Sequence, residues 1–290
     1  MALLTSQQIS KYYDTFKTID VTFTKEVIKT TALQPHQVCL KCVGEQWPCV
    51  IFSSSFSGAK LLASAKGQLG ERIKGANNMV SLRFSFKVSE KTDPRAFFVA
   101  GKVAGFAPYA QSNGDLQFIS IQYTQRPPDD LIEILGRLLE ANVNSARRRD
   151  ERILLTADSM RRIGLQSKDT VVFIQGVPRK CIIRDLSFCG AKVIVVGLAK
   201  FLVGKECLFR VEFEEPRQTL EIKGKVVRFE DVEGRKDLAA VAVQFDEQHI
   251  PMNYKIHIND FIMQTRGPKP EEGAAAPNPG PEGSADGSGR

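Results

Sequence analysis

Short runs in which apolar and polar residues alternate recur along most of the chain, separated by glycine, asparagine, serine or proline. Their β-branched and aromatic content and two-residue period are typical of strands with one buried face. We predict strands at Val38–Cys42, Cys49–Ser53, Met79–Val88, Phe97–Phe106 and Leu116–Tyr123 in the first half, and at Ile153–Ala157, Thr170–Ile174, Lys180–Asp185, Lys192–Val196, Glu206–Glu214, Leu220–Glu230 and Ala239–Asp246 in the second. Many short strands at this regular spacing favour closed antiparallel barrels, which leave no sheet edge exposed.

Helical periodicity interrupts the strands. Between the halves, leucines and isoleucines from Leu131 to Leu139 recur at i, i+3/i+4 spacing, after two prolines and two aspartates that can start and cap a helix. We therefore predict a helix over Asp129–Glu140. A similar stretch, Met252–Met263, closes the second half, and Ile9, Tyr12, Tyr13 and Phe16 form a weaker stripe near the start.

The two halves of the chain repeat one another. The aligned blocks are Cys49–Lys60 with Cys181–Lys192, Gly101–Phe106 with Gly224–Phe229, and Phe118–Tyr123 with Ala240–Phe245. Three matched blocks in the same order indicate a duplicated structural unit. The sequence thus predicts a mainly β fold of two tandem six- to seven-stranded antiparallel barrels, each followed by a helix.

The composition agrees with two globular units. At 290 residues and 42% hydrophobic content, the chain can build two cores. No apolar run approaches the roughly 20 residues that span a bilayer. The N-terminus lacks the basic and apolar regions of a signal peptide, so we expect a cytoplasmic protein. From Gly267 onward large apolar residues are absent, and residues 267–290 are predicted to be disordered.

Charge and cysteine content narrow the function. A net charge of +7 and a pI of about 9.1 favour an anionic partner: a nucleotide, a nucleic acid or a membrane surface. The six cysteines are too sparse for a disulfide scaffold and fit a reducing compartment. Cys39 and Cys42 lack a second Cys/His pair at metal-ligand spacing, so we predict no metal site. No histidine has a catalytic partner at suitable spacing, and we expect no enzymatic activity.

Two motifs carry the candidate chemistry. Arg148 and Arg152 lie where a helix is predicted to end and a strand to begin, and Asp185 to Gly190 form an Asp-x-Ser-x-x-Gly turn between predicted strands. Arginine grips phosphate bidentately and also hydrogen-bonds guanine O6 and N7. The aspartate can accept from guanine N–H groups, Ser187 adds a small donor and acceptor, and glycine allows close ligand approach. Each motif alone also suits a solvated helix end or an ordinary hairpin turn.

Together the two motifs resemble the signature of PilZ domains, the receptors for the bacterial messenger cyclic di-GMP. The resemblance implies that Arg148, Arg152, Asp185, Ser187 and Gly190 bind the ligand. The residue before the first motif arginine also touches ligand in that family. Here it is Arg147, which would favour an intercalated pair of messenger molecules, and no other cofactor is implied. We expect ligand binding to fold the arginine arm onto the barrel wall.

The first half keeps Ser55 and Gly58 but has Ser53 where the motif needs aspartate, and no paired arginines precede it. It resembles a degenerate PilZ-like barrel, and the layout is similar to the PlzA-like proteins of spirochaetes. We predict a PilZN-type domain over residues 1–141, an arginine-bearing linker over 142–153, the ligand-binding PilZ domain over 154–266 and the tail beyond. The first half is expected to bind no messenger.

Two functions follow from these observations. The first is a non-enzymatic cyclic di-GMP receptor, a monomer that binds the messenger at the junction, changes the orientation of its domains and signals to an unidentified downstream protein. A role in motility or virulence is implied only by the family. The alternative is a basic nucleic-acid-binding protein, acting alone or alongside the messenger. Dispersed basic residues and the lack of an RNP-like aromatic strand weigh against it.

Overall fold

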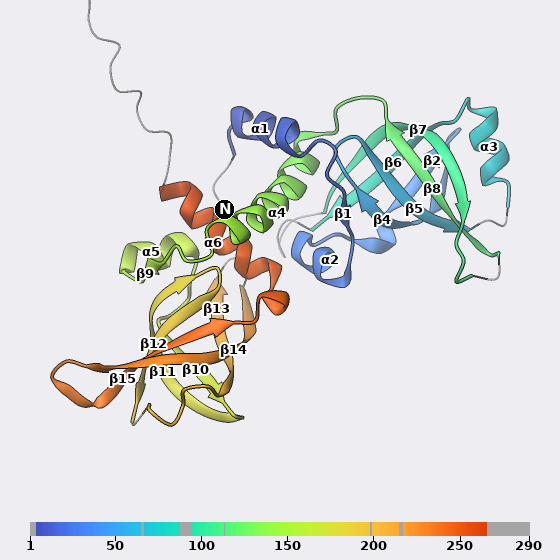
Figure 1. Cartoon of the computed structure of the whole chain (residues 1–290). Coiled ribbons are helices and arrows are strands. Elements are labelled where there is room, and N and C mark those ends of the chain that lie inside the picture. Colours follow the sequence, from blue (N-terminus) through green and yellow to red (C-terminus); the bar gives the residue numbers. More distant parts are fainter. Residues whose placement is uncertain are drawn as a thin grey trace, which may run out of the picture.

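The computed structural model describes residues 4–265 apart from 65–66, 88–93, 113, 198 and 215–216. Two strand-rich units lie at opposite ends of the described chain, and helices α1, α4 and α6 lie between them (Figure 1). The predicted disordered tail and Val88 lie outside the described residues. The prediction of a mainly β fold in two units, each followed by a helix, is confirmed.

The N-terminal unit is a curled antiparallel sheet with helices at its margins. Its elements are α1 (Ser6–Phe16), β1 (Val21–Thr22), α2 (Lys25–Thr31), a 3-10 turn (Pro35–Gln37), β2 (Cys39–Cys42), β3 (Glu45–Pro48), β4 (Val50–Ser54), β5 (Gly58–Ser64), α3 (Leu69–Gly75), β6 (Met79–Phe86), β7 (Arg95–Pro108), β8 (Leu116–Tyr123) and α4 (Asp129–Arg147). The strand order is β1-β4-β5-β8-β7-β6-β2-β3. Strands β3 and β4 lie near opposite ends of this order, yet a single residue connects them along the chain. The two ends of the sheet must therefore approach one another, and the sheet curls.

The C-terminal unit is a closed barrel. Its elements are β9 (Ile153–Leu154), α5 (Ala157–Ile163), β10 (Asp169–Ile174), β11 (Val177–Ser187), β12 (Gly190–Val196), β13 (Glu206–Glu214), β14 (Arg217–Val232), β15 (Arg235–Phe245), a 3-10 turn (Glu247–His249) and α6 (Met252–Thr265). The order is β10-β13-β14-β15-β12-β11, and β10 also pairs with β11, which closes the ring. Closure by strand pairing thus distinguishes this unit from the N-terminal sheet, which we had also expected to close.

The duplication extends further than the sequence blocks suggest. The short strand β1 pairs with β4 just as β9 pairs with β11. Thr24 and Thr156 cap the helices α2 and α5 that follow these strands. The sequence predicted neither helix. The predicted strand Ile153–Ala157 extends only to Leu154, because the Thr156 hydroxyl accepts from the Ser159 N–H and starts α5.

The hydrophobic residues form two separate cores, one in each unit. Helix α4 buries Leu131, Ile132 and Leu135 in the first core, and α6 buries Tyr254, Ile258 and Ile262 in the second. The predicted helices are therefore confirmed, although α4 continues to Arg147 rather than ending near Glu140. No helix among the described residues is long and apolar enough to cross a membrane.

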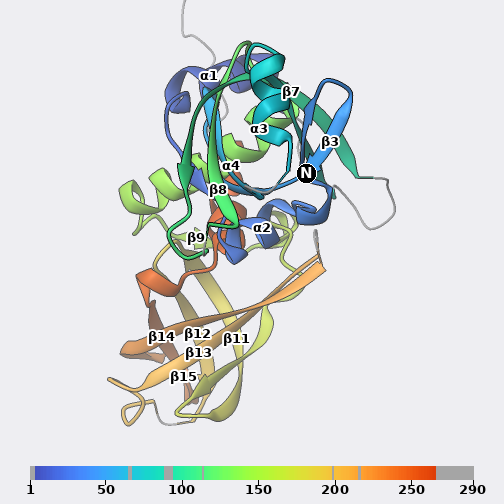
Figure 2. The ribbon, with the colours of Figure 1, turned by 90° about the vertical axis from the view of Figure 1, so that its right-hand side faces the viewer.

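Polar contacts join the two units where α4 meets α6, at the waist between the sheets (Figure 2). The Asn144 amide donates to Asn259 Oδ1 at 2.7 Å, and Arg137 pairs with Asp260. Glu140 of α4 accepts from the hydroxyl of Tyr12 at 2.8 Å and from the amide of Asn259 at 3.1 Å. The contact between the units thus combines side-chain hydrogen bonds and an ion pair with the packing of Met252 of α6 against the first core.

Candidate functional site

The motif arginines lie where α4 passes into the C-terminal barrel. Arg147 is the last residue of α4, and Arg148 follows as its C-terminal cap, with its N–H donating to the Asn144 carbonyl at 2.8 Å. The Glu151 N–H then donates back to the Arg148 carbonyl at 3.1 Å. The chain therefore turns directly after Arg148 and enters the C-terminal unit.

The Asp-x-Ser-x-x-Gly turn joins β11 to β12. A register shift after Ile183 places Leu186 and Phe188 in the core, and Asp185 and Ser187 on the opposite side of the strand are also buried, at 8% and 1% exposure. The Ser187 hydroxyl donates to the Gly190 carbonyl at 3.2 Å and closes the turn. From the other side, the buried hydroxyl of Tyr254 on α6 donates to the Ser187 carbonyl at 2.7 Å. Helix α6 and the turn are thus held together.

The structure brings the two motifs into contact. Arg152 Nη1 lies 2.6 Å from Asp185 Oδ1, and the Asp185 side chain is only 11% exposed. The Cys189 thiol donates to the Arg149 carbonyl at 3.0 Å, and Arg149 pairs with Glu247 beside the barrel. The arginine segment therefore already lies against the barrel wall, whereas we had expected ligand to bring it there.

Arg148 carries an unsatisfied hydrogen-bonding group. Its Nη1 is buried and has no hydrogen-bond partner among the described residues. Leaving a buried guanidinium nitrogen without an acceptor costs free energy. A ligand that supplied an acceptor to this nitrogen would remove that cost. Arg147, one residue earlier, is exposed at the end of α4.

One cation near the site was missed at the sequence level. Lys192 pairs in register with Asp185, and its Nζ lies 2.6 Å from Glu230 Oε2 on β14. The hydrogen bond from Lys192 holds the pKa of the Glu230 carboxyl below its usual range. The signal was present, because Lys192 aligns with Lys60 in the repeat. Its outward neighbours on β15 are small, since Ala242 pairs with Lys192 and Ala240 with Ile194.

Gly190 has a structural role as well as the predicted ligand role. A Cβ placed on Gly190 would lie 2.4 Å from the Val243 carbonyl oxygen, and the equivalent Gly58 would meet the Ile121 oxygen at the same distance. Both glycines therefore permit close approach of a neighbouring strand. In the N-terminal unit Ser53 occupies the position of Asp185, in register with Lys60.

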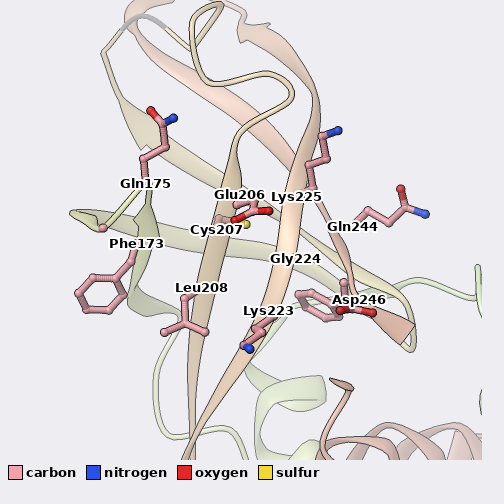
Figure 3. A pocket seen from close by; sticks show the side chains of 12 residues that line it. Phe173, Gln175, Glu206, Cys207, Leu208, Lys223, Gly224, Lys225, Gln244 and Asp246 are labelled. Atoms are coloured by element: carbon pink, nitrogen blue, oxygen red, sulfur yellow. The ribbon is translucent and has the colours of Figure 1, made fainter. Parts of the chain in front are cut away.

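A groove of about 830 Å³ lies on another part of the C-terminal barrel (Figure 3). It runs over β10, β13, β14 and the end of β15, and its labelled side chains include Phe173, Leu208, Lys223 and Gln244. None of the six predicted ligand residues lines it. Its link to the motif is Gln244, which pairs with Gly190.

Five of the six cysteines are buried, and Cys189 in the β11–β12 turn is partly buried. All six are thiols, and burial raises the pKa of Cys49 and of Cys181 to about 12. Over the described ranges, no group of three or more His, Cys, Asp or Glu side chains is placed to hold a metal ion.

Comparison with known proteins covers most of the chain. The PilZN3 domain model matches residues 7–142, and the PilZ domain model matches residues 146–264. A cyclic di-GMP binding protein of Treponema denticola is 49% identical over 268 residues, which is 92% of this chain and 85% of that protein.

Two solved structures show weaker likeness. The PlzA protein of Borreliella burgdorferi in complex with c-di-GMP is 23% identical, with 89% of this chain and 99% of that chain covered and a TM-score of 0.41. YcgR of Escherichia coli in complex with c-di-GMP is 12% identical, with 83% and 88% covered and a TM-score of 0.27. On the domain matches and the identity to the Treponema denticola relative, the chain belongs to the PilZ-domain family, with a PilZN3 domain preceding its PilZ domain.

Proposed function

We propose that the protein is a receptor for cyclic di-GMP and binds it between the end of α4 and the β11–β12 turn. The observation that carries the proposal is the contact of Arg152 with Asp185, at 2.6 Å, beside an Arg148 nitrogen that lacks an acceptor. The Treponema denticola relative, at 49% identity, is itself named a cyclic di-GMP binding protein. A dianionic ligand with two guanines matches this set of groups.

Each side chain has a separate task in the proposed complex. Arg148 and Arg152 hold phosphate oxygens and guanine edges, which their planar, multi-donor groups suit. Asp185 accepts from guanine N–H groups and keeps Arg152 oriented. Ser187 adds a hydroxyl, and Gly190 lets the ligand approach the backbone. Arg147, exposed at the end of α4, favours an intercalated pair of messenger molecules over a single one.

The N-terminal unit lacks these groups and is proposed to bind no messenger. Ser53 cannot replace the negative charge of Asp185. The turn itself is preserved, because Ser55 Oγ and Gly58 O still lie 3.5 Å apart. We propose the same division as above, with the PilZN-type unit in residues 1–141, the linker in 142–153 and the messenger-binding unit in 154–266.

The proposed output is a change in the mutual orientation of the two units that alters a contact with a downstream protein. Helix α6 contacts both the proposed messenger site and the other unit. Tyr254 donates to the Ser187 carbonyl, and Asn259 contacts Asn144 on α4. Polar interfaces between domains commonly permit reorientation, whereas large apolar ones do not. Effects on motility or virulence would follow from the contact that changes.

Calorimetric titration of cyclic di-GMP into single variants tests the site. We expect Arg148→Ala and Arg152→Ala each to weaken binding by about 2–5 kcal/mol, tens- to thousands-fold, because phosphate loses a desolvated partner. Arg161→Ala is the matched control, since Arg161 is 82% exposed on α5 and forms an ion pair only with Asp158 among the described residues. Undiminished binding in both motif variants would refute the site, and heat from residual tight binding in the Arg152→Ala chain would contradict a silent N-terminal unit.

The absence of catalysis is part of the proposal. Cyclic di-GMP incubated with the full chain should be recovered intact, as chromatography of the nucleotide would show. Time-dependent appearance of linear dinucleotide or GMP would mean that the protein is an enzyme.

A further inference from the structure

Six strands of the N-terminal sheet carry charge of one sign only, and Glu45 on the edge strand β3 pairs with Arg72. Within the described bounds of β2 and β4–β8 there is no aspartate or glutamate. The same strands contain five cations: Lys41, Lys60, Arg83, Arg95 and Lys102. The C-terminal barrel differs, because β13 alone contains Glu206, Glu212 and Glu214. The strands of the second unit thus mix charges of both signs, whereas these strands of the first unit carry cations alone.

Four of these cations share the outer face of the sheet. Register places Lys60 opposite Ser120 on β8, and Lys102 opposite Gln122 two residues further along the same side. Lys102 also pairs with Met79 on β6, whose alternate residues Ser81 and Arg83 continue the face, and Lys41 pairs with Ser81. The intervening residues, such as Leu82, Val99 and Ile121, are buried in the core.

Aromatic rings lie among these cations. Phe52 and Phe98 are 44% and 43% exposed, and Phe118 is half-buried beside Phe52, with ring centroids 5.2 Å apart. Lys60 Nζ lies 4.3 Å from the Phe118 centroid, and Lys41 Nζ lies 5.7 Å from that of Phe98. We call this surface the basic–aromatic face, made of Lys41, Phe52, Lys60, Arg83, Phe98, Lys102 and Phe118.

The face corresponds to the messenger-site face of the second unit. Lys60 aligns with Lys192, but Phe118 takes the place of Ala240. The second unit therefore has a small side chain at this position, whereas the first unit has an aromatic ring. The first unit has Ser53 in place of Asp185 and lacks the paired arginines. On this face it carries cations and phenylalanine rings instead.

We propose that the basic–aromatic face binds single-stranded nucleic acid. Such ligands need cations that track the phosphates and aromatic rings on which bases stack, and an open sheet face can offer both. An acidic protein segment would use the cations but would have no specific need for the exposed rings. The net charge of +7 adds long-range attraction for a polyanion. This activity is independent of messenger binding on the second unit.

Fluorescence anisotropy with a labelled oligouridylate of about 16 nucleotides tests the proposal on the full chain. Lys60→Gln/Lys102→Gln should reduce the slope of log affinity against log salt by about 1.4, because two cations no longer displace counterions. Phe118→Ala and Phe52→Ala should each weaken binding about 5- to 150-fold through lost stacking. Lys200→Gln and Phe201→Ala are matched controls, since Lys200 Nζ lies 4.9 Å from the exposed Phe201 ring on the other unit.

Circular dichroism and thermal melting of every variant show whether the N-terminal unit is folded, and cyclic di-GMP titration shows whether the other unit is intact. Retained messenger binding with weakened oligonucleotide binding supports the face. If the wild-type chain gives no salt-dependent binding, or if the face variants behave like the controls, the proposal is wrong. Equal competition by a polyglutamate of matched charge would mean that the rings have no role, which would also overturn it.

Discussion

At the scale of single residues, the motif contains two kinds of position. Gly190 and Ser187 shape the turn, and Gly58 and Ser55 do the same in a unit that lacks the ligand groups. The Asp185 carboxylate pairs with the guanidinium of the motif arginine Arg152, whereas Cys189 of the turn contacts only the Arg149 backbone among the described arginines. A retained serine and glycine therefore report the fold, while the aspartate and arginines report the ligand chemistry.

Glycine-to-alanine substitutions test this separation. Gly58→Ala and Gly190→Ala should each destabilise their own unit by about 1–3 kcal/mol, because the new methyl group would press on a carbonyl oxygen of the neighbouring strand. Chemical denaturation followed by far-UV circular dichroism measures the decrease in the free energy of unfolding. The control is Gly70→Ala in α3, where nothing lies within 4 Å of the added carbon. If Gly58→Ala left the free energy of unfolding unchanged, strands β5 and β8 would have to move apart without cost, which would contradict the prediction.

At the scale of elements, α6 links the barrel to the rest of the molecule. His257 on this helix stacks on Phe213, with ring centroids 3.8 Å apart. Its Nδ1–H donates to the Ile163 carbonyl at 3.0 Å, so Nε2 accepts from the Gln218 amide at 3.2 Å. This arrangement suits the neutral ring, and burial lowers the pKa of His257 to about 4.

The buried histidine makes the C-terminal unit sensitive to acid. Because the unfolded chain takes up a proton near pH 6.5 and the folded chain only near pH 4, stability is fully present above pH 6.5 and declines between these values. The loss should be about 1.4 kcal/mol per pH unit, about 3 kcal/mol in all. Urea denaturation at stepped pH measures it. His257→Gln should flatten the slope, while the exposed His36→Gln should leave it unchanged.

At the scale of the whole molecule, two separate apolar cores meet through a largely polar contact, to which Met252 of α6 adds packing against the first core. Arg137 and Asp260 are 14% and 26% exposed, so their pairing is the most buried ion pair between α4 and α6 that the described residues show. Such a contact fixes one orientation but does not fuse the cores. This is the physical basis on which reorientation of the units is proposed.

Removing one partner of this pair should be costly. Arg137→Met leaves a half-buried carboxylate unpaired and should destabilise the docked arrangement by about 3 kcal/mol, whereas Arg137→Met/Asp260→Leu should recover most of it. Differential scanning calorimetry should show one transition separating into two in the single variant. Arg161→Met, which breaks an exposed pair, serves as the control. Unchanged unfolding in Arg137→Met would mean that the pair does not hold the units together.

Messenger-driven reorientation has its own measurement. Small-angle scattering of the full chain should change on addition of cyclic di-GMP, and the change should disappear in Arg152→Ala. Identical profiles with and without saturating messenger would leave the receptor binding its ligand without the proposed movement.

The sequence determined much of this protein by local rules. Alternation and turn residues located most strands, the leucine stripe located α4, and the repeat showed that one unit had been duplicated. The short helices α2 and α5 were missed, since each depends on a single threonine cap rather than on a periodic pattern.

The tertiary structure alone decided how the distant pieces meet. Arg152 and Asp185 are 33 positions apart in the sequence. Their contact depends on the turn after α4, which the sequence did not predict. The sequence weighed against nucleic-acid binding because its basic residues are dispersed, and the residues of the basic–aromatic face lie on six strands. Only the register of an antiparallel sheet, which sums many weak pairings across the chain, places them on one side.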